Sequence, residues 1–182
     1  VSLNAQRNTN ASQTSLSVSM QRLSSGLRVN SAKDDAAGLA IAERMNAQVR
    51  GMNVAVRNAN DGISMAQTAE GARSKVGDSL QRMRELAVQA RNSTNSDSDK
   101  DSLDKEFGEL AKEIQRVIGG TTFNTKAILG ADAGSLTFQV GANTTTSDTI
   151  DITTSDLTTD AIITAVAGTD NTGAGRALID NT

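Results

Sequence analysis

The residues that most resemble a metal site are Asp97, Asp99 and Asp101, which form a D-x-D-x-D pattern. Calcium-binding loops use carboxylates in this way, but they also need a glycine at the sixth position and a glutamate at the twelfth. The chain has Ser102 and Gly108 at those positions. We therefore interpret the segment as a solvated turn whose carboxylates lie at the N-terminus of a helix, where negative charge is favourable.

Two further motifs could do chemistry only in a different context. Asp34 and Asp35 are adjacent carboxylates, but neighbouring residues of a helix point in different directions, so a capping or packing role is favoured over acid–base chemistry. The run Gly119-Gly120-Thr121-Thr122 lacks the Lys-Ser/Thr ending of a phosphate-binding loop and indicates the end of a helix.

The composition excludes most catalytic machinery. The 182 residues include no Cys, His, Pro, Trp or Tyr and only three Phe. Without Cys or His there is no thiolate nucleophile, no Ser-His-Asp triad and no ordinary zinc site. Few aromatic rings remain to stack on bases or sugars. We expect no enzyme, no cofactor and no bound metal.

The charge and hydropathy of the chain limit the classes of partner that it could bind. Residues 1–130 carry 17 basic and 14 acidic side chains, whereas residues 131–182 carry one Arg against seven Asp. A nucleic-acid binder would need a dense basic stripe, which is missing. No apolar run approaches about 20 residues, so membrane insertion is not expected. The N-terminus also lacks the pattern of a cleavable secretion signal.

The spacing of apolar residues predicts a mainly α fold of long, antiparallel, coiled-coil-like helices. The first helix is expected over about residues 3–27, with Leu16, Met20, Leu23 and Leu27 on one face. The second is expected from Ala42 to Ala90, with a phase shift of its apolar stripe near Glu70 and Gly71. The third is expected over about residues 102–118.

The remainder of the chain changes character. Alternation of apolar and polar residues at 136–140 and 150–152 predicts a β-hairpin. Residues 153–182 are rich in Thr, Asp and Ala and predict a small irregular tail, with at most one short helix around residues 160–167.

Two stripes with heptad spacing are the candidate assembly seam. They could pack only within the chain, but they are long and contain small residues such as Ala42, Ala59 and Ala66 that allow close helix approach, so we favour burial against another subunit or a missing partner helix. The seam residues are Met45, Val49, Met52, Val56, Ile63, Leu103, Phe107, Leu110 and Ile114.

Long segments of the chain resemble bacterial flagellins, over residues 1–152 almost without gaps. The matching segments are Ser2–Asn8, Gln21–Met45 (QRLSSGLRVNSAKDDAAGLAIAERM), Arg57–Gly71 (RNANDGISMAQTAEG), Leu80–Gln89 (LQRMRELAVQ), Asn92–Ser96 (NSTNS), Thr122–Asn124 (TFN) and Phe138–Asn143 (FQVGAN). The chain begins a few residues later than the family pattern and ends without the family's C-terminal helices. The resemblance therefore implies the N-terminal part of a filament subunit.

The resemblance also implies an organisation, a location and partners. Residues 1–33 would belong to the inner coiled-coil layer, residues 34–152 to the next helical layer with its β-hairpin, and residues 153–182 to the start of the variable outer region. Such subunits are secreted through the flagellar export apparatus and form an extracellular filament for motility. Their partners would be other flagellin subunits, an export chaperone and the flagellar cap and junction proteins.

Host recognition is a further implication of the resemblance. Flagellins of many bacteria are detected by a Toll-like receptor, through a patch on the second and third helices. The matching receptor-contact residues are Gln81, Arg82, Glu85, Leu86, Gln89 and Glu106. Because Arg82, Leu86 and Gln89 recur at spacings of four and three, they are expected on one helix face, with Leu86 as an apolar centre between charges.

Two other classes of function stay open at this point. A surface adhesin or polysaccharide-binding homologue could use the same helices, but residues 153–182 offer no evident aromatic platform or convergent polar group. An enzyme is disfavoured by the missing His and Cys. A further pair of heptad helices or an appended domain in a longer sequence would discriminate between these functions.

Overall fold

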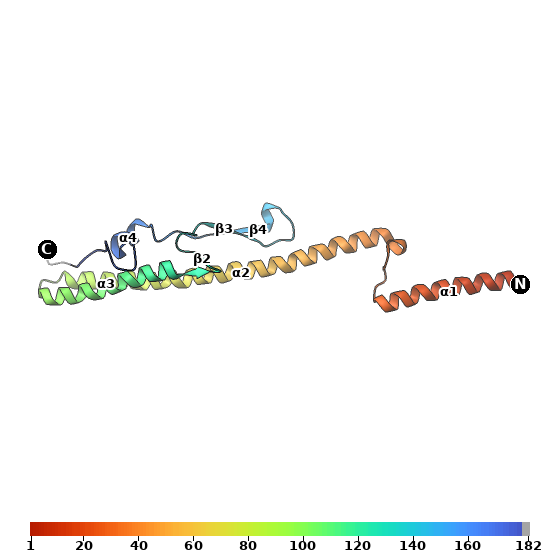
Figure 1. Ribbon diagram of the computed structural model, residues 1–182, viewed down its shortest axis with the longest axis horizontal. Coiled ribbons are helices and arrows are strands. Elements are labelled where there is room, and N and C mark those ends of the chain that lie inside the picture. Colours follow the sequence, from red (N-terminus) through yellow and green to blue (C-terminus); the bar gives the residue numbers. More distant parts are fainter. Residues whose placement is uncertain (180–182) are drawn as a thin grey trace. The chain divides into compact units, whose positions relative to one another are not determined.

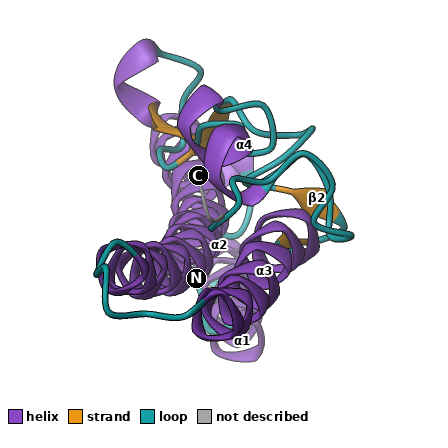
Figure 2. Cartoon of the chain, turned by 90° about the vertical axis from the view of Figure 1, so that its left-hand side faces the viewer, coloured by secondary structure: helices purple, strands orange, loops and turns teal. Residues whose placement is uncertain are grey.

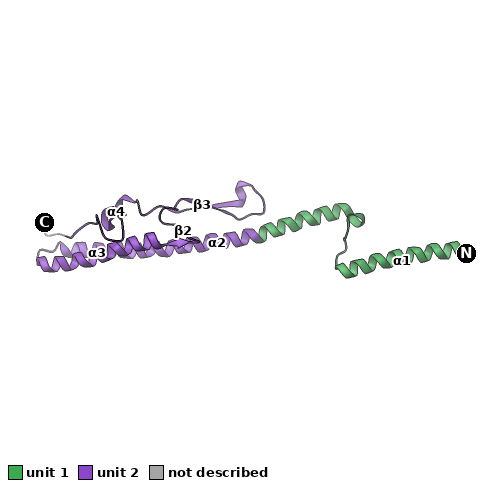
Figure 3. Cartoon of the chain, viewed as in Figure 1, with its two compact units in different colours: residues 1–53 green, residues 54–182 purple. Residues whose placement is uncertain are grey.

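The computed structural model describes residues 1–179 and confirms the mainly α fold with long helices and a β-hairpin (Figure 1). Two compact units are distinguished, one of residues 1–53 and one of residues 54–182, and the boundary falls within the second helix (Figure 3). No helix in the described part of the chain combines the length and the apolar character needed to cross a membrane.

The first helix, α1 (Ser2–Ser25), has no buried residue. It ends at Gly26, which adopts a left-handed conformation with φ 70° and donates its N–H to the carbonyl of Arg22. Glycine takes this conformation without steric cost. Leu16, Met20 and Leu23 are all exposed, so the apolar stripe of α1 is uncovered in this chain.

The second helix, α2 (Ala32–Ala90), contains one non-helical residue, Asp35, with φ −165° and ψ 96°. The Asp35 carboxylate accepts the backbone N–H of Gly38 at 2.8 Å, while the Asp34 carboxylate accepts the N–H groups of Asn30 and Ser31. Both carboxylates thus satisfy backbone donors at the start of a helical run. The capping role predicted for this Asp pair is confirmed.

The third helix, α3 (Asp97–Gly120), runs antiparallel to the C-terminal part of α2 (Figure 1). It begins more than one turn earlier than predicted because Ser96 and Asp99 form a reciprocal capping box. The Ser96 N–H donates to Asp99 Oδ2 at 2.9 Å, and the Asp99 N–H donates to Ser96 Oγ at 3.3 Å. Asp97 and Asp99 therefore lie in a helical first turn, as the solvated-turn interpretation predicted.

One uninterrupted heptad seam forms the buried face of α2, which packs against the β-hairpin at Gly62 and against α3 further toward the C-terminus. The buried residues of α2 recur every seven positions without a break, and Met65 and Leu86 fill the intermediate positions. The seven-residue series is Ala55, Gly62, Ala69, Val76, Met83 and Ala90. The phase shift predicted near Glu70 is therefore wrong for the buried face. It arose from joining this seam to a second apolar stripe one residue further along the helix, which is about 100° away.

The predicted β-hairpin packs on α2. Strands β3 (Ser135–Gln139) and β4 (Thr149–Thr153) pair antiparallel, with Leu136 opposite Ile152, and a 3₁₀ turn, η1 (Thr146–Asp148), precedes β4. A Cβ on Gly62 would lie 3.3 Å from the ring of Phe138, so glycine lets the hairpin approach the helix closely. Asn58 Nδ2 also donates to the carbonyl of Gln139 at 3.0 Å.

A second, smaller strand pair was not predicted. Strands β1 (Thr122–Phe123) and β2 (Lys126–Ala127) are joined by Asn124 and Thr125, both at positive φ. Asn tolerates positive φ, whereas Thr adopts it rarely. Asn124 is therefore typical of a tight hairpin turn, but Thr125 is not, and the sequence predicts the turn only weakly.

The short helix predicted near residues 160–167 is confirmed as α4 (Ala161–Ala167), which lies over α3 (Figure 2). Asp160 caps it by accepting the N–H groups of Ile162 and Ile163. Its buried residues join a core formed by α2, α3 and the segment containing Ile128 and Leu129.

Candidate functional site

Across residues 1–179, no three acidic side chains lie close enough together to hold a metal ion. A group of exposed, charged side chains converges where α2 and α3 run side by side. The chemistry of this candidate site is that of ion pairs and exposed amides.

Arg82 is the centre of this surface. Its Nε donates to Glu106 Oε1 across to α3 at 2.9 Å, and its Nη1 donates to Glu85 Oε2 on its own helix at 3.1 Å. These bonds, above all the one to Glu106, raise the pKa of the Arg82 guanidinium above its usual value. Because the three side chains are well exposed, the network contributes little to stability and stays available to a partner.

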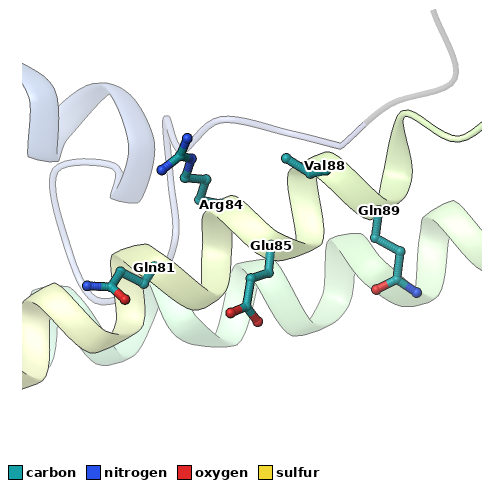
Figure 4. A pocket seen from close by; sticks show the side chains of 5 residues that line it. All are labelled: Gln81, Arg84, Glu85, Val88 and Gln89. Carbon is teal, nitrogen blue, oxygen red and sulfur yellow. The ribbon is translucent and has the colours of Figure 1, made fainter.

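An open hollow of about 760 Å³ adjoins this ion network. It is lined by Gln81, Arg84, Glu85, Val88 and Gln89, all from α2 (Figure 4). Gln81, Glu85 and Gln89 follow one another along the helix, as expected for residues four apart. Three of the residues predicted for receptor contact therefore line one depression, and Arg82 and Glu106 lie beside it.

Leu86 does not share this exposure. Its side chain is only 1% exposed, and it belongs to the heptad seam that faces α3. The spacing of four and three places Arg82, Leu86 and Gln89 on roughly the same face of α2. Each residue turns the helix by about 100°, so a small rotation is enough to move Leu86 from the exposed surface into the core. In this structure Leu86 supports the surface from below and is not its apolar centre.

The residues predicted for the assembly seam divide into two groups. Phe107 and Ile114 on α3 are buried in the chain's own core, and Leu103 and Leu110 are half-buried beside it. All five residues on α2 are exposed. They are Met45, Val49, Met52, Val56 and Ile63. The stripe on α2 is therefore uncovered in the isolated chain, whereas the α3 residues already have a partner in α2.

Sequence reasoning missed a clasp between α3 and the C-terminal segment. Arg176 binds Asp104 through two hydrogen bonds of 2.8 and 2.6 Å, and the Ile179 N–H donates to the same carboxylate at 2.9 Å. The guanidinium lies over Gly108, whose hypothetical Cβ would be 3.1 Å from it. The partners lie 72 positions apart, so only the conspicuous isolation of Arg176 in an acidic tail could have indicated it.

Weakening the clasp is expected to release the segment around Arg176. The bond to Arg176 holds the pKa of Asp104 below its usual value, so this stabilisation is present at neutral pH and is lost as the pH falls below about 4. At neutral pH, Asp104→Asn should cost about 2 kcal/mol and speed tryptic cleavage after Arg176 several-fold. Glu113→Gln, which removes the exposed pair with Arg116, is the matched control. Equal cleavage rates in both variants would contradict the clasp.

Comparison with known proteins shows which family the chain resembles. The family model described as the bacterial flagellin N-terminal helical region matches residues 1–135. A flagellin of Salmonella typhimurium is 56% identical over 152 residues, covering 84% of this chain and 30% of the relative. The B-type flagellin of Pseudomonas aeruginosa is 50% identical over 161 residues, covering 88% of this chain and 33% of the relative.

A solved structure agrees with the sequence comparison. The crystal structure of Bacillus cereus flagellin superposes with a TM-score of 0.53 at 32% identity, covering 64% of this chain and 68% of that one. The chain spans about 30% of the length of the Salmonella flagellin and a similar share of the other curated relative.

Proposed function

Because the chain belongs to the bacterial flagellin family, we propose that it forms the N-terminal helical part of a structural subunit of the flagellar filament. The observation that supports the proposal best is the amount of patterned apolar surface left uncovered. The whole stripe of α1 and the second stripe of α2 are exposed, although both have the periodicity of packed helices. Soluble monomers rarely leave such stripes unpaired.

In the proposed filament, neighbouring subunits and the rest of the subunit cover these stripes. Each large apolar side chain that goes from exposed to fully buried contributes about 1.5–3 kcal/mol, so covering a stripe of four or five residues favours association. The Ser, Thr and Asn residues of α1 are poor helix formers, so covering its stripe would also stabilise the helix.

Export and location follow from the same proposal. A filament subunit acts outside the cell, so we infer an extracellular location after passage through the flagellar export apparatus. Uncovered apolar stripes before assembly are the kind of surface that an export chaperone protects. The same stripes would meet the flagellar cap and junction proteins at the ends of the filament.

Hydrogen exchange tests the assembly proposal directly. In the isolated chain, the amides of residues 16–27 are expected to exchange close to the rate of an unstructured peptide, because nothing buries α1. In filaments of a full-length flagellin that carries this sequence, they should become strongly protected. The amides around Ile114, which is already fully buried, are the internal control in both states. Strong protection of residues 16–27 in the monomer would contradict the proposal.

We further propose that the surface around Arg82 is recognised by a host Toll-like receptor, as the resemblance implies. The support from the geometry is an exposed cation held between two carboxylates, beside an open hollow whose lining includes the amides of Gln81 and Gln89. Arginine can donate up to five hydrogen bonds in a planar fork, and it is enriched among interface residues that dominate binding energy. The proposed contacts are Gln81, Arg82, Glu85, Gln89 and Glu106, with Leu86 holding the surface in place.

Arg82→Ala is expected to reduce receptor signalling by purified monomer about thirtyfold, the effect of losing roughly 2 kcal/mol at a binding hot spot. The stability of the monomer should change little, because the Arg82 ion pairs are exposed. Arg116→Ala provides the control, since it also removes an exposed ion pair, here with Glu113, outside the proposed contacts. Unchanged signalling by Arg82→Ala, or an equal loss in Arg116→Ala, would remove the support for this surface.

A further inference from the structure

The last described part of the chain is fastened to α3 at two places by polar groups. Near the C-terminus of α3, the side-chain amide of Gln115 donates a hydrogen bond to the carbonyl of Gly168. Near the N-terminus of α3, Asp104 binds Arg176. Gln115 and Asp104 are separated by about three helical turns, so these two anchors lie on the same face of α3, about 16 Å apart. We call residues 161–179, which comprise α4 and the segment after it, the strap.

Apolar burial contributes less to the strap than to the helical seam beneath it. The buried residues of α4 are Ile163 and Ala167. The largest fully buried side chains among the described residues all lie elsewhere, in α2, in α3 and at Ile128 and Leu129. Because buried apolar area is the main source of folding free energy, detaching the strap should cost less free energy than separating α2 from α3.

The segment between the two anchors gains conformational freedom when it is released. It forms a turn in which the Thr169 N–H donates to the carbonyl of Ala174 at 3.4 Å. Gly168 and Gly175 have φ values of 80° and 71°, and a Cβ on Gly168 would overlap the Ala174 carbonyl. Glycine loses more conformational freedom on folding than any other residue, so its release favours an open state of the strap.

We propose that the strap opens and closes as one unit while α2 and α3 stay packed, with Asp104 and Gln115 as its two anchors. Both anchors break in the same opening, so weakening either one raises the open population along the whole strap. The anchors join groups within residues 104–179, so the proposal does not depend on the filament function or on any further segment. Opening lets the end of the described chain move without disturbing the heptad seam.

Thiol labelling can measure this opening because the chain has no cysteine of its own. In the 182-residue chain, Ala167→Cys places a thiol in α4 at a position that is 0% exposed, and Val76→Cys places one in the heptad seam. The reagent is kept dilute enough that labelling is slower than reclosing, so each rate reports the population in which that thiol is accessible. We expect the strap thiol to be labelled at least about tenfold faster than the seam thiol.

Leu86→Ala tests whether the seam stays packed when the strap opens. Leu86 lies in the seam, so its truncation should destabilise the closed state and the strap-open state equally. It should accelerate labelling of Val76→Cys about tenfold or more and leave labelling of Ala167→Cys unchanged. Leu86→Val is a milder substitution for the same measurement, and circular dichroism checks that each variant is folded. Equal acceleration of both thiols would overturn the proposal, because the strap would then open only when the seam does.

Asp104→Asn tests whether the strap opens as one unit, because Asp104 lies at the opposite end of the strap from Ala167. Gln115→Met removes the nearer anchor and keeps a side chain of similar length. Each substitution should accelerate labelling of Ala167→Cys at least about fivefold. Glu113→Gln, which removes the exposed ion pair with Arg116 on the same helix, is the matched control and should leave the rate unchanged. An unchanged rate at Ala167→Cys in Asp104→Asn would show that the two ends open separately and would refute the single unit.

Discussion

Val56→Asp is expected to abolish filament formation by a full-length flagellin that carries this sequence, while leaving the isolated chain folded. Val56 is 61% exposed, so an aspartate there is solvated in the monomer. In the proposed filament it lies in the middle of the covered stripe, between Met52 and Ile63 along the same face. Burying an unpaired carboxylate there should cost about 3 kcal/mol or more, which raises the critical concentration about a hundredfold.

The matched control for this substitution is Ser64→Asp. Ser64 is exposed on α2 and lies about 130° around the helix from both the buried seam and the exposed stripe. The Ser64→Asp substitution introduces the same negative charge on the same helix as Val56→Asp. Sedimentation of assembled filaments and circular dichroism of the monomers measure the two effects. Normal filaments from Val56→Asp, or equal loss from Ser64→Asp, would show that the exposed stripe is not an assembly seam.

The local elements could be predicted from sequence because each carries its own signal. Heptad spacing indicated α1, α2 and α3, and the alternation at residues 136–140 indicated the hairpin. Asp160, which caps α4 in the structure, is a local signal of the same kind. The early start of α3 was missed because the capping box of Ser96 and Asp99 extends the helix toward its N-terminus, before Leu103, the first residue of its apolar stripe. Capping signals are local, so this error could have been avoided.

The tertiary arrangement was harder to predict because two apolar stripes share α2. Periodicity shows that a helix face is apolar, but it does not show which partner covers it. The Ala55–Ala90 seam faces the hairpin at Gly62 and has Met83 and Leu86 where it faces α3. The exposed stripe from Met45 to Ile63 is bulkier and reads as the stronger core signal. The clasp of Asp104 and Arg176 depends on contacts between distant segments, which no local pattern reveals.

Leu86→Ala is expected to destabilise the packing of α2 on α3 by about 3 kcal/mol, because truncating a fully buried leucine leaves a cavity. Met83→Ala should cost a similar amount, since Met83 is equally buried one turn earlier in the same seam. Chemical denaturation of the two variants measures this directly. A loss below about 1 kcal/mol for Leu86→Ala would contradict its place in the core.

The same pair of variants decides how Leu86 acts in receptor recognition. Met83 is not among the proposed receptor contacts, yet its truncation disturbs the same seam. If Leu86 only supports the surface, Leu86→Ala and Met83→Ala should reduce receptor signalling equally at a temperature where both remain folded. Arg82→Ala should then reduce signalling with almost no loss of stability. A loss of signalling in Leu86→Ala that Met83→Ala does not share would instead mean that Leu86 leaves the core and contacts the receptor, which requires the α2–α3 packing to rearrange on binding.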